Sequence, residues 1–515
     1  MNMKKNLFLT LVVLLLSLSV AAQDKVTQKV LEMGRTDNRT MEHADFLANR
    51  IGGRLIGSYS LVQAEQWVKE QFESWGLEVM MQEVGEINVG FNRGPWFGRI
   101  LGGDGMNLHF CTPSYTAGTK GPQMGHTVLE PRTRAEFERC KGRLKGAWVL
   151  LDTPSNGFAL NRSAQADSVR AAAIERDIKV KEENREIERY NRQHPDAPKP
   201  FKKLSTEPAL FYKEMCEAGV LGFIQPAKLP ITCLYDRANC YQMTMETLPT
   251  VCDIKLDQRQ YAIIREKTAA KEDFFLEFDI RNHFAKGPVK YHNVIGIMKG
   301  SKYPDQTVIL GGHLDAYDAA TGAVDDANGV SVTMEAARLL AAAGAKPKRT
   351  ILFCIWTGEE YGLLGSKFFV ESGAYDINKV SNYFNRDSGP TLATSITVPA
   401  AMYDDFVKAA KPIENYVEGA PFVVKKRENT PKRPKSAGGS DHAHFVLHGA
   451  PAFGLSISDP FGYNFQYGEI WHTDRDRYNK LIPEYMEPSS VISAVIAYGI
   501  ANLDHQLSRE GMYSD

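Results

Sequence analysis

The sequence lacks an excess of charge of either sign. Its 61 lysine and arginine residues nearly balance 62 aspartate and glutamate residues, which leaves a formal net charge of -1 at pH 7. Binding to a nucleic-acid backbone or to an anionic lipid surface depends on clustered positive charge, and no strong positive field is available here. We therefore expect neither nucleic acid nor a membrane surface among the partners of this protein.

At its N-terminus the sequence has an apolar run, but it lacks the length to cross a membrane. The charge-free stretch from Leu7 to Val20 follows two lysines and leads to small residues that end at Ala22. It is shorter than the roughly 20 residues that a spanning helix needs, and its three parts follow the order of a secretory signal. We predict a cleavable signal peptide over residues 1–22, an exported protein that is periplasmic or secreted, and no stable membrane anchor. An uncleaved anchor is the weaker alternative.

Cysteine is scarce, and its number is odd. Of the seven cysteines, six lie between Cys111 and Cys252, whereas Cys354 sits inside the apolar run ILFCIW. Cys354 is expected to be a buried small hydrophobic residue. Export to an oxidising compartment permits disulfides among the other six, but their spacing does not determine which would pair.

What the sequence does contain is an α/β pattern towards both ends of the chain. Apolar positions from Leu61 to Trp75 recur at helical spacing, and a strand follows the stop at Gly76. The pattern resumes near residue 292, with apolar runs separated by helices. The predicted fold class is α/β, with a mostly parallel central sheet flanked by helices. The later elements are runs at 292–298, 307–312, 350–356, 380–385 and 451–458 and helices at 329–343 and 487–503.

The stretch between these regions has a different composition. Residues 95–284 contain short strands beside glycine turns, many prolines and most of the cysteines. We interpret them as an inserted second domain, so that residues 23–94 and 285–515 form one discontinuous domain. Inside the insertion, residues 164–193 are helical in composition and dense in both charge signs, which is typical of a solvated surface helix. A lid or a homodimer contact is the alternative.

Acidic and histidine residues follow each of four predicted strands. In open α/β sheets, ligands bind at the carboxyl ends of the strands, so these residues are expected to meet in one site. The residues are His313, Asp315, Asp325, Asp326, Glu359, Glu360, Asp387 and His472. They follow the apolar runs TVILGG, ILFCIWTG, VSNYFNR and PAFGLSIS.

Such a group of carboxylates requires a compensating charge. Like charges repel in a low dielectric and each ion loses hydration, and a divalent cation removes both problems. Oxygen and imidazole ligands without cysteine suit catalytic zinc rather than structural zinc. Two histidines and three carboxylates are too many for one open tetrahedral ion, but they fit two ions that share a bridging carboxylate.

Six motifs between residues 311 and 476 resemble those of the M28 family of zinc exopeptidases, particularly its secreted branch. They are GGHLD, VDDANG, WTGEEYG, NRDSG, GGSDHAHF and WHTDRD, and GRLIGS extends the resemblance to residues 53–58. The resemblance implies the zinc exopeptidase fold, an enzyme acting on peptide substrates and two Zn2+ ions as cofactors. The insertion resembles a protease-associated domain more loosely.

The resemblance also implies which residues hold the metal. His313 and Asp387 would bind one zinc ion, Glu360 and His472 would bind the other, and Asp325 would bridge the two.

Further roles follow from the same motifs. Glu359 would be the general base, and Asp315 would hold the imidazole of His313 in place. Four other residues have two equal interpretations, support of the site or an ordinary turn or cap, and they are Asp326, Ser440, Asp441 and His442.

The implied chemistry is hydrolysis by an activated water molecule. A zinc pair lowers the pKa of such a water towards about 7 and polarises the carbonyl, while Glu359 would accept the proton and return it to the leaving amine. Many M28 peptidases have an oxyanion-holding tyrosine directly before the last histidine, whereas this chain has Trp471. That role is weakened, filled by the indole N–H, or moved to a phenol such as Tyr463 or Tyr467.

The favoured function is an exopeptidase that acts near the N-terminus of peptides, an aminopeptidase, with a dipeptidase or carboxypeptidase as the alternative on the same scaffold. A single-zinc glutaminyl cyclase shares the fold but is disfavoured, because a two-metal ligand set is present. A non-catalytic binding protein is disfavoured because all five ligands and Glu359 remain. A serine hydrolase has little support, because Ser440 lacks the G-x-S-x-G setting.

Overall fold

The computed structural model describes residues 25–102, 105–161 and 166–514. The predicted signal peptide lies outside these ranges. The chain forms two compact units. The first contains the residues up to Glu86, Lys290–Trp471 and the residues from Asp476 onwards, and the second contains Ile87–Val289 with His472–Arg475.

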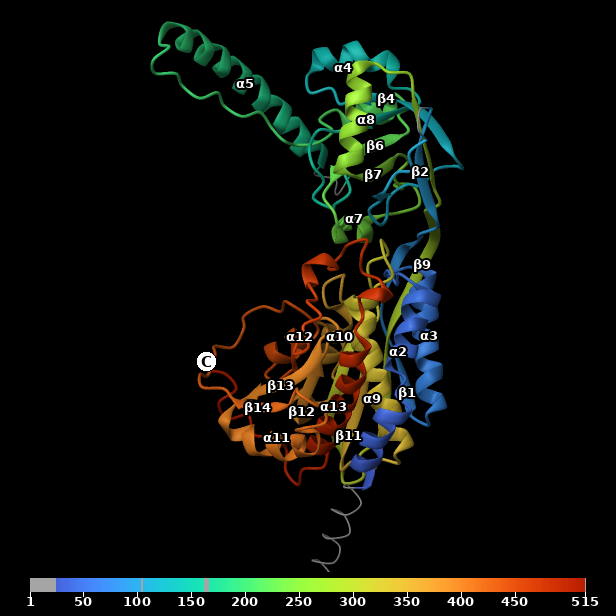
Figure 1. Ribbon diagram of the computed structural model, residues 1–515, viewed down its shortest axis with the longest axis vertical. Coiled ribbons are helices and arrows are strands. Elements are labelled where there is room, and N and C mark those ends of the chain that lie inside the picture. Colours follow the sequence, from blue (N-terminus) through green and yellow to red (C-terminus); the bar gives the residue numbers. More distant parts are fainter. Residues whose placement is uncertain (1–24, 103–104, 162–165, 515) are drawn as a thin grey trace, which may run out of the picture. The chain divides into compact units, whose positions relative to one another are not determined.

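A five-stranded sheet in the order β1-β9-β11-β10-β12 forms the centre of the first unit, and β1, β9, β11 and β12 are labelled in Figure 1. β10 pairs in parallel with both β11 and β12, whereas β9 is antiparallel to β11. Only residues 299–302 separate β9 from β10, too few for the helical crossover that a parallel strand needs. The sheet is therefore mixed, and parallel where the site motifs follow. The strands are β1 (Glu78–Asn92), β9 (His283–Met298), β10 (Tyr303–His313), β11 (Arg349–Trp356) and β12 (Val380–Asn385).

Helices bury this sheet, which confirms the predicted α/β class. Every residue of β11 is buried, as expected for a strand covered on both faces. Helices α9 (Asn328–Ala342) and α13 (Pro483–Ala501) pack on each other and on β10 and β11. In another part of the core, Phe369 of α10 (Leu364–Ser372) and Phe445 of α12 (His442–Leu447) contact Trp356. The predicted helix near residues 61–75 is α3 (Tyr59–Ser74).

One predicted strand of the central sheet is wrong. Within residues 451–458 only β15 (Ser456–Ser458) is a strand, and it pairs with β13 (Leu392–Val398) in a separate three-stranded sheet. β14 (Val423–Lys426) completes that sheet. Pro451 has no N–H to donate to a neighbouring strand, and Gly454 weakens a strand interior. The strand therefore does not extend over the whole apolar run.

The second unit contains a seven-stranded sheet in the order β2-β8-β4-β5-β6-β7-β3. The charged helix predicted near residues 164–193 is α5 (Ala166–Gln193), whose buried residues all lie between Arg170 and Val180. Its assignment as a lid or dimer contact, and that of the insertion as a protease-associated domain, stay predictions. The strands are β2 (Trp96–Leu101), β3 (Phe110–Cys111), β4 (Gln123–Leu129), β5 (Ala147–Leu150), β6 (Gly222–Ala227), β7 (Cys252–Asp257) and β8 (Phe275–Ile280), and the other helices are α4 (Arg134–Cys140), α6 (Tyr212–Glu217), α7 (Arg237–Gln242) and α8 (Gln258–Ala270).

Two predictions from composition can be compared with the structure. All seven cysteines are free thiols, and Cys354 is fully buried in the sheet. Across residues 25–102, 105–161 and 166–514, no helix combines the length and the apolar character that crossing a membrane requires.

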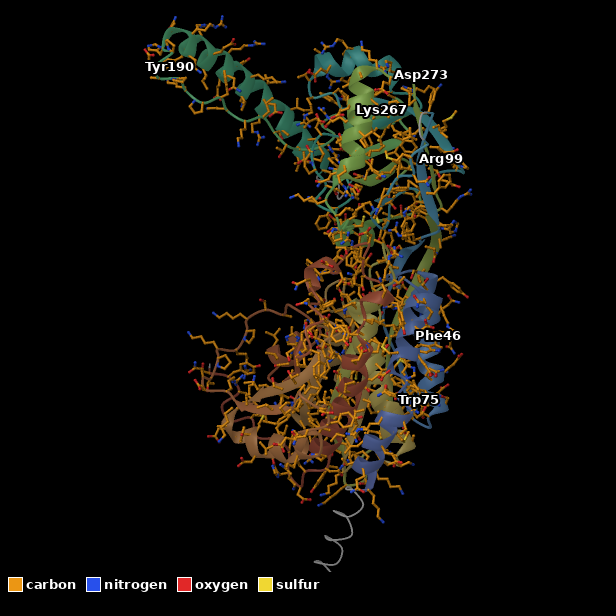
Figure 2. All side chains as sticks on the ribbon, in the orientation of Figure 1. Phe46, Trp75, Arg99, Tyr190, Lys267 and Asp273 are labelled. Carbon is orange, nitrogen blue, oxygen red and sulfur yellow. The ribbon has the colours of Figure 1, made fainter. Side chains whose placement is uncertain are left out.

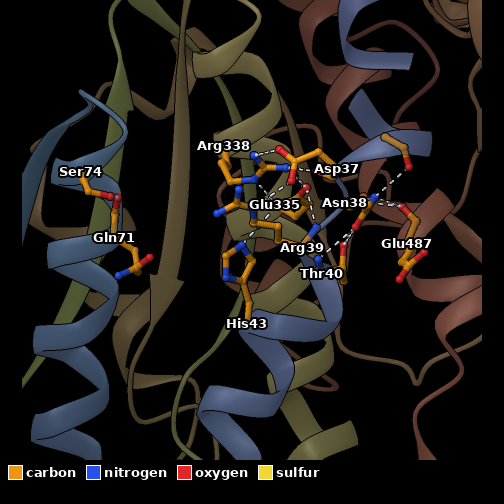
Figure 3. A network of polar contacts seen from close by, with 12 residues as sticks. Asp37, Asn38, Arg39, Thr40, His43, Gln71, Ser74, Glu335, Arg338 and Glu487 are labelled. Atoms are coloured by element: carbon orange, nitrogen blue, oxygen red, sulfur yellow. Dashed lines mark hydrogen bonds and ion pairs between the residues drawn. The ribbon is translucent and has the colours of Figure 1, made fainter. Parts of the chain in front are cut away.

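A buried ionic network joins helix α2 (Thr40–Asp45) to α9 (Figure 3). Glu335 of α9 has no exposed surface, and its carboxylate accepts hydrogen bonds from Arg338 at 2.8 Å and from the main-chain N–H of Arg39 at 3.0 Å. Its second oxygen lies 3.2 Å from Nε2 of His43. A buried carboxylate must be paired in this way to offset its lost hydration. The network thus holds α2 against α9, which begins three residues after Asp325.

A cavity of about 540 Å3 lies beside this network. Its walls include Phe46 and Trp75, labelled in Figure 2, together with Trp67, which stacks on Phe46 with ring centroids 4.4 Å apart. None of the five predicted metal ligands lines this cavity.

Candidate metal centre

The three parallel strands end at one edge of the sheet. His313, the last residue of β10, is aligned with Trp356, the last residue of β11. Two residues earlier on β10, Gly311 is aligned with Asn385, the last residue of β12. The loops that follow these strands therefore begin side by side, and they carry the acidic motifs.

The five predicted ligands fall into two overlapping groups. In the first, a ligand atom of each of His313, Asp325 and Asp387 lies within 4.8 Å of the others. In the second, the same holds for Asp325, Glu360 and His472. Asp325 belongs to both groups, which is the arrangement that a bridging carboxylate would have.

The imidazole of His313 is oriented by its own loop. Its Nδ1 lies 2.8 Å from the main-chain carbonyl oxygen of Asp315, so an Nδ1–H donates to that oxygen and leaves Nε2 for a metal. Nε2 faces the carboxylates of Asp325 at 3.2 Å and Asp387 at 3.7 Å.

The predicted role of the Asp315 carboxylate needs correction. Its nearest oxygen is 3.9 Å from Nδ1 of His313, too far for a hydrogen bond. Instead the two oxygens accept the main-chain N–H groups of Glu359 at 3.0 Å and Glu360 at 3.1 Å. The carboxylate of Asp315 therefore anchors the glutamate pair, and the main-chain carbonyl of Asp315 holds the imidazole of His313.

The glutamate pair lies in a turn rather than in a strand. β11 ends at Trp356, and Gly358 has a φ of +66°, a left-handed conformation that favours glycine. This agrees with the expectation that the chain turns before the pair. The carboxyl group of Glu359 has its pKa raised to about 10 by burial and by the neighbouring acids, against the opposing effect of His313. Burial also raises the pKa of Glu360 well above its usual range.

Asp325 and Asp326 lie in the tight turn Ala323–Ala327 before α9, and both have non-helical backbone angles. The carboxylate of Asp326 accepts the N–H of His313 at 3.1 Å and that of Gly329 at 2.9 Å. Asp326 thus caps the start of α9 and also holds the main chain of His313, so these contacts fit both predicted interpretations.

The electrostatics of the group favour a cation. Burial opposes protonation of His313, yet Glu359, Asp325 and Asp387 together raise its pKa well above the usual range. Burial raises the pKa of Asp441 to about 7. Burial opposes ionisation of the Asp387 carboxyl group, but the nearby His313 and the hydroxyl of Ser440 outweigh this effect and lower its pKa. Divalent zinc, which takes imidazole and carboxylate ligands, fits this donor set and would offset the repulsion among the acids.

Three other predicted residues lie near Asp387. Ser440 accepts a hydrogen bond from Nδ2 of Asn385 at 2.9 Å and donates to Asp387. Asp441 and His442 begin helix α12, and His442 interacts electrostatically with Asp387. These residues line the Asp387 side of the site.

The candidates for holding an oxyanion differ in their surroundings. Trp471 is 53% exposed, and Tyr463 is 48% exposed and interacts with Glu484. Tyr467 packs against the apolar cluster that includes Val324, and its ring approaches Gly389, two residues after Asp387. Burial and the nearby carboxylates of the metal site raise its pKa.

Two buried residues that contact the ligand loops were missed by the sequence analysis. They are Arg54 and Asp476, and both lie inside motifs that carry the family resemblance, GRLIGS and WHTDRD. A buried arginine and a buried aspartate beside a ligand loop would have been reasonable candidates for positioning it. The motifs alone do not reveal which main-chain groups they bind.

Comparison with known proteins gives consistent matches. Residues 293–495 match Peptidase family M28. Carboxypeptidase Q of Rattus norvegicus is 24% identical over 505 residues, which cover 95% of this chain and 92% of the relative. A probable glutamate carboxypeptidase of Arabidopsis thaliana is 37% identical over 188 residues, or 33% of this chain and 26% of that protein.

The fold also matches a solved structure. A peptidase M28 precursor from Shewanella amazonensis SB2B aligns with a TM-score of 0.56 and 19% identity, over 94% of this chain and 98% of that one. At this identity the match shows a shared fold. The sequence matches support a metallopeptidase, and the part of the chain that is similar to peptidase family M28 is residues 293–495.

Proposed function

We propose that the protein is an exported di-zinc exopeptidase that cleaves near the N-terminus of peptides. The observation that carries this proposal is the place of Asp325 in both ligand groups. One ion would be held by His313 and Asp387, the other by Glu360 and His472, and Asp325 would contribute to both. Two-metal hydrolases use such a shared ligand to keep their ions about 3.5–4 Å apart.

Zinc bound here would supply a water molecule of lowered pKa and would polarise the substrate carbonyl. Glu359 belongs to neither ligand group, so its carboxylate is available for proton transfer. Cations on the neighbouring carboxylates would lower its raised pKa towards the range in which a base accepts a proton and returns it. Asp315 holds the main chain of Glu359 and fixes the position of this base.

The charges around the site support recognition of a substrate amine rather than a substrate carboxylate. Arg54 and Arg386 contact the site loops, but both are buried and donate hydrogen bonds to main-chain carbonyl groups. Glu359 and Asp441 are acidic groups outside the two ligand groups. With zinc bound, the three ligand carboxylates would offset most of the charge of the ions, and the additional acidic groups would attract an ammonium group. A carboxypeptidase is the second candidate, because similar proteins are named carboxypeptidase Q.

A panel of short peptides tests this proposal. We expect hydrolysis of free-amine peptides by the zinc-loaded protein and at least 100-fold slower hydrolysis of the same peptides after N-acetylation, because an acylated N-terminus loses its charge. C-terminal amidation is the matched control and should have little effect. Products are identified by mass spectrometry, which also distinguishes release of single residues from release of dipeptides.

Other outcomes of the panel would reject the assignment. Cleavage that tolerates N-acetylation but is abolished by C-terminal amidation would make the protein a carboxypeptidase. A peptide with N-terminal glutamine that loses ammonia and keeps its peptide bonds would indicate a glutaminyl cyclase.

We also propose that the hydroxyl of Tyr467 donates to the developing oxyanion, because its ring approaches Gly389 and its phenol interacts electrostatically with Asp325 and Asp387. Tyr467→Phe is expected to lower kcat about 100-fold, the lower end of the range for loss of an oxyanion donor. KM and zinc content should change little. Tyr463→Phe is the matched control, since Tyr463 is exposed beside Glu484. Equal kcat values for the two variants would remove Tyr467 from this role.

A further inference from the structure

The loop between β10 and α9 carries Asp325, but it has little regular structure of its own. Asp325 has φ −113° and ψ 89°, so its main chain is not helical. Main-chain N–H and C=O groups that leave helices and strands must find other partners when they are buried. In this loop, residues 314–325, two buried charged side chains provide those partners.

Asp476 binds the N–H groups of the loop. One oxygen of its carboxylate accepts the N–H of Val324 at 2.7 Å, and the other accepts the N–H of Asp325 at 3.1 Å. Its main-chain carbonyl accepts the N–H of Thr321 at 3.0 Å and the hydroxyl of the same residue at 3.2 Å. Asp476 is only 5% exposed.

Arg54 binds the carbonyl groups of the same loop. Its Nε donates to the carbonyl of Leu314 at 2.6 Å, and its two terminal nitrogens donate to those of Thr321 at 3.0 Å and Gly322 at 2.8 Å. The same guanidinium donates to the carbonyl of Gly52 at 2.8 Å. Arg54 is fully buried.

The two residues therefore hold opposite polar groups of one short segment. Burying a carboxylate and a guanidinium is costly, and the cost is offset here by hydrogen bonds to the loop and by the attraction between the two charges. Neither residue belongs to a metal-ligand group. Asp476 contacts the main chain of Asp325, which both ligand groups share, and Arg54 contacts the loop up to Gly322, three residues earlier.

We propose that Asp476 and Arg54 are positioning residues that fix Asp325 in the geometry needed to contact two metal ions. This inference rests on the proposed di-zinc function. The two residues act through the loop and do not touch the substrate. Hydrogen-bonding partners of metal ligands commonly change metal affinity about 10- to 100-fold when they are removed.

The test is a zinc titration of the full-length protein, starting from the metal-free form and read by isothermal calorimetry and metal analysis. Asp476→Asn places an amide NH2 against one of two main-chain N–H groups. We expect it to weaken binding of at least one zinc ion about 10- to 100-fold. Excess zinc should then restore most of kcat, whereas KM should change little. The visible spectrum of the cobalt-substituted protein should also change, because a shifted Asp325 alters the geometry around the ions.

The structure offers a matched control in the same unit. Asp459 also accepts two main-chain N–H groups through its two oxygens, from Tyr463 at 2.9 Å and Asn464 at 2.7 Å, and lies in an exposed loop. Asp459→Asn should bind zinc within twofold of the wild type. Arg54→Lys is the second test variant, since it keeps the charge but cannot donate to several carbonyls at once. Arg54→Lys should also weaken zinc binding, and it provides the test if Asp476→Asn does not fold.

The outcomes separate this inference from the proposed function. Wild-type zinc affinity and an unchanged cobalt spectrum in a folded Asp476→Asn or Arg54→Lys protein would overturn the positioning role. So would an equal loss of zinc affinity in Asp459→Asn. If the wild type itself binds fewer than two zinc ions, the di-zinc function fails first, whatever the variants show.

Discussion

Glu359→Gln is expected to keep its zinc and to lower kcat by about 10²- to 10⁴-fold, the usual contribution of general acid–base catalysis. Glutamine has nearly the same shape as glutamate, and Glu359 belongs to neither ligand group, so the metal site should survive. An amide cannot accept the proton of the attacking water, which removes the base. The measurement is steady-state hydrolysis of a free-amine peptide, with zinc content determined on the same sample.

The pH dependence of this variant provides a second readout. In the wild type, activity should fall as the pH drops through the pKa of Glu359 in the zinc-loaded enzyme, since the base must be deprotonated. That acidic limb should be absent from the residual activity of Glu359→Gln. Glu371→Gln, on the exposed face of α10, is the control and should behave as the wild type. Normal turnover by Glu359→Gln would show that another group is the base.

Glu360→Ala is expected to lose one zinc ion and nearly all activity. Glu360 lies in only one ligand group, with Asp325 and His472, and it is 4% exposed. Its removal leaves that ion with two protein ligands, fewer than the three that catalytic zinc sites use. Metal analysis after gel filtration should give close to one ion per chain, and the ion held by His313 and Asp387 should remain.

Glu359→Ala is the matched variant, because it truncates the neighbouring side chain in the same turn. It should retain both ions and lose activity. If Glu360→Ala kept two ions, or if Glu359→Ala lost one, the division of roles between the adjacent glutamates would be reversed or absent.

The convergence of the site residues at one edge of the sheet could be predicted because it depends on local sequence patterns. Three apolar runs predict three parallel strands, and parallel strands end at the same edge of a sheet. The residues His313, Glu360 and Asp387, which come at or after these ends, are therefore expected to lie close together. The glycine and threonine before Glu359 indicated the end of a strand, and β11 does end at Trp356.

Other features could not be predicted because they depend on contacts between distant residues. Nothing in the sequence around Asp315 indicates that its carboxylate binds the N–H groups of residues 359 and 360. The hydrogen bond from Arg54 to Leu314 joins residues 260 positions apart. The run at 451–458 was assigned to the wrong sheet because apolar composition does not specify a strand's partner. Such contacts are decided by the packed structure.

We expect the two adjacent glutamates to have separate roles, with Glu360 binding metal and Glu359 transferring the proton. Zinc content and kcat, measured side by side on the wild type, Glu359→Gln and Glu360→Ala, test this expectation most directly. We expect two ions and full activity for the wild type, two ions and at least 100-fold lower kcat for Glu359→Gln, and one ion with negligible activity for Glu360→Ala. Two ions in Glu360→Ala, or wild-type kcat in Glu359→Gln, would contradict it.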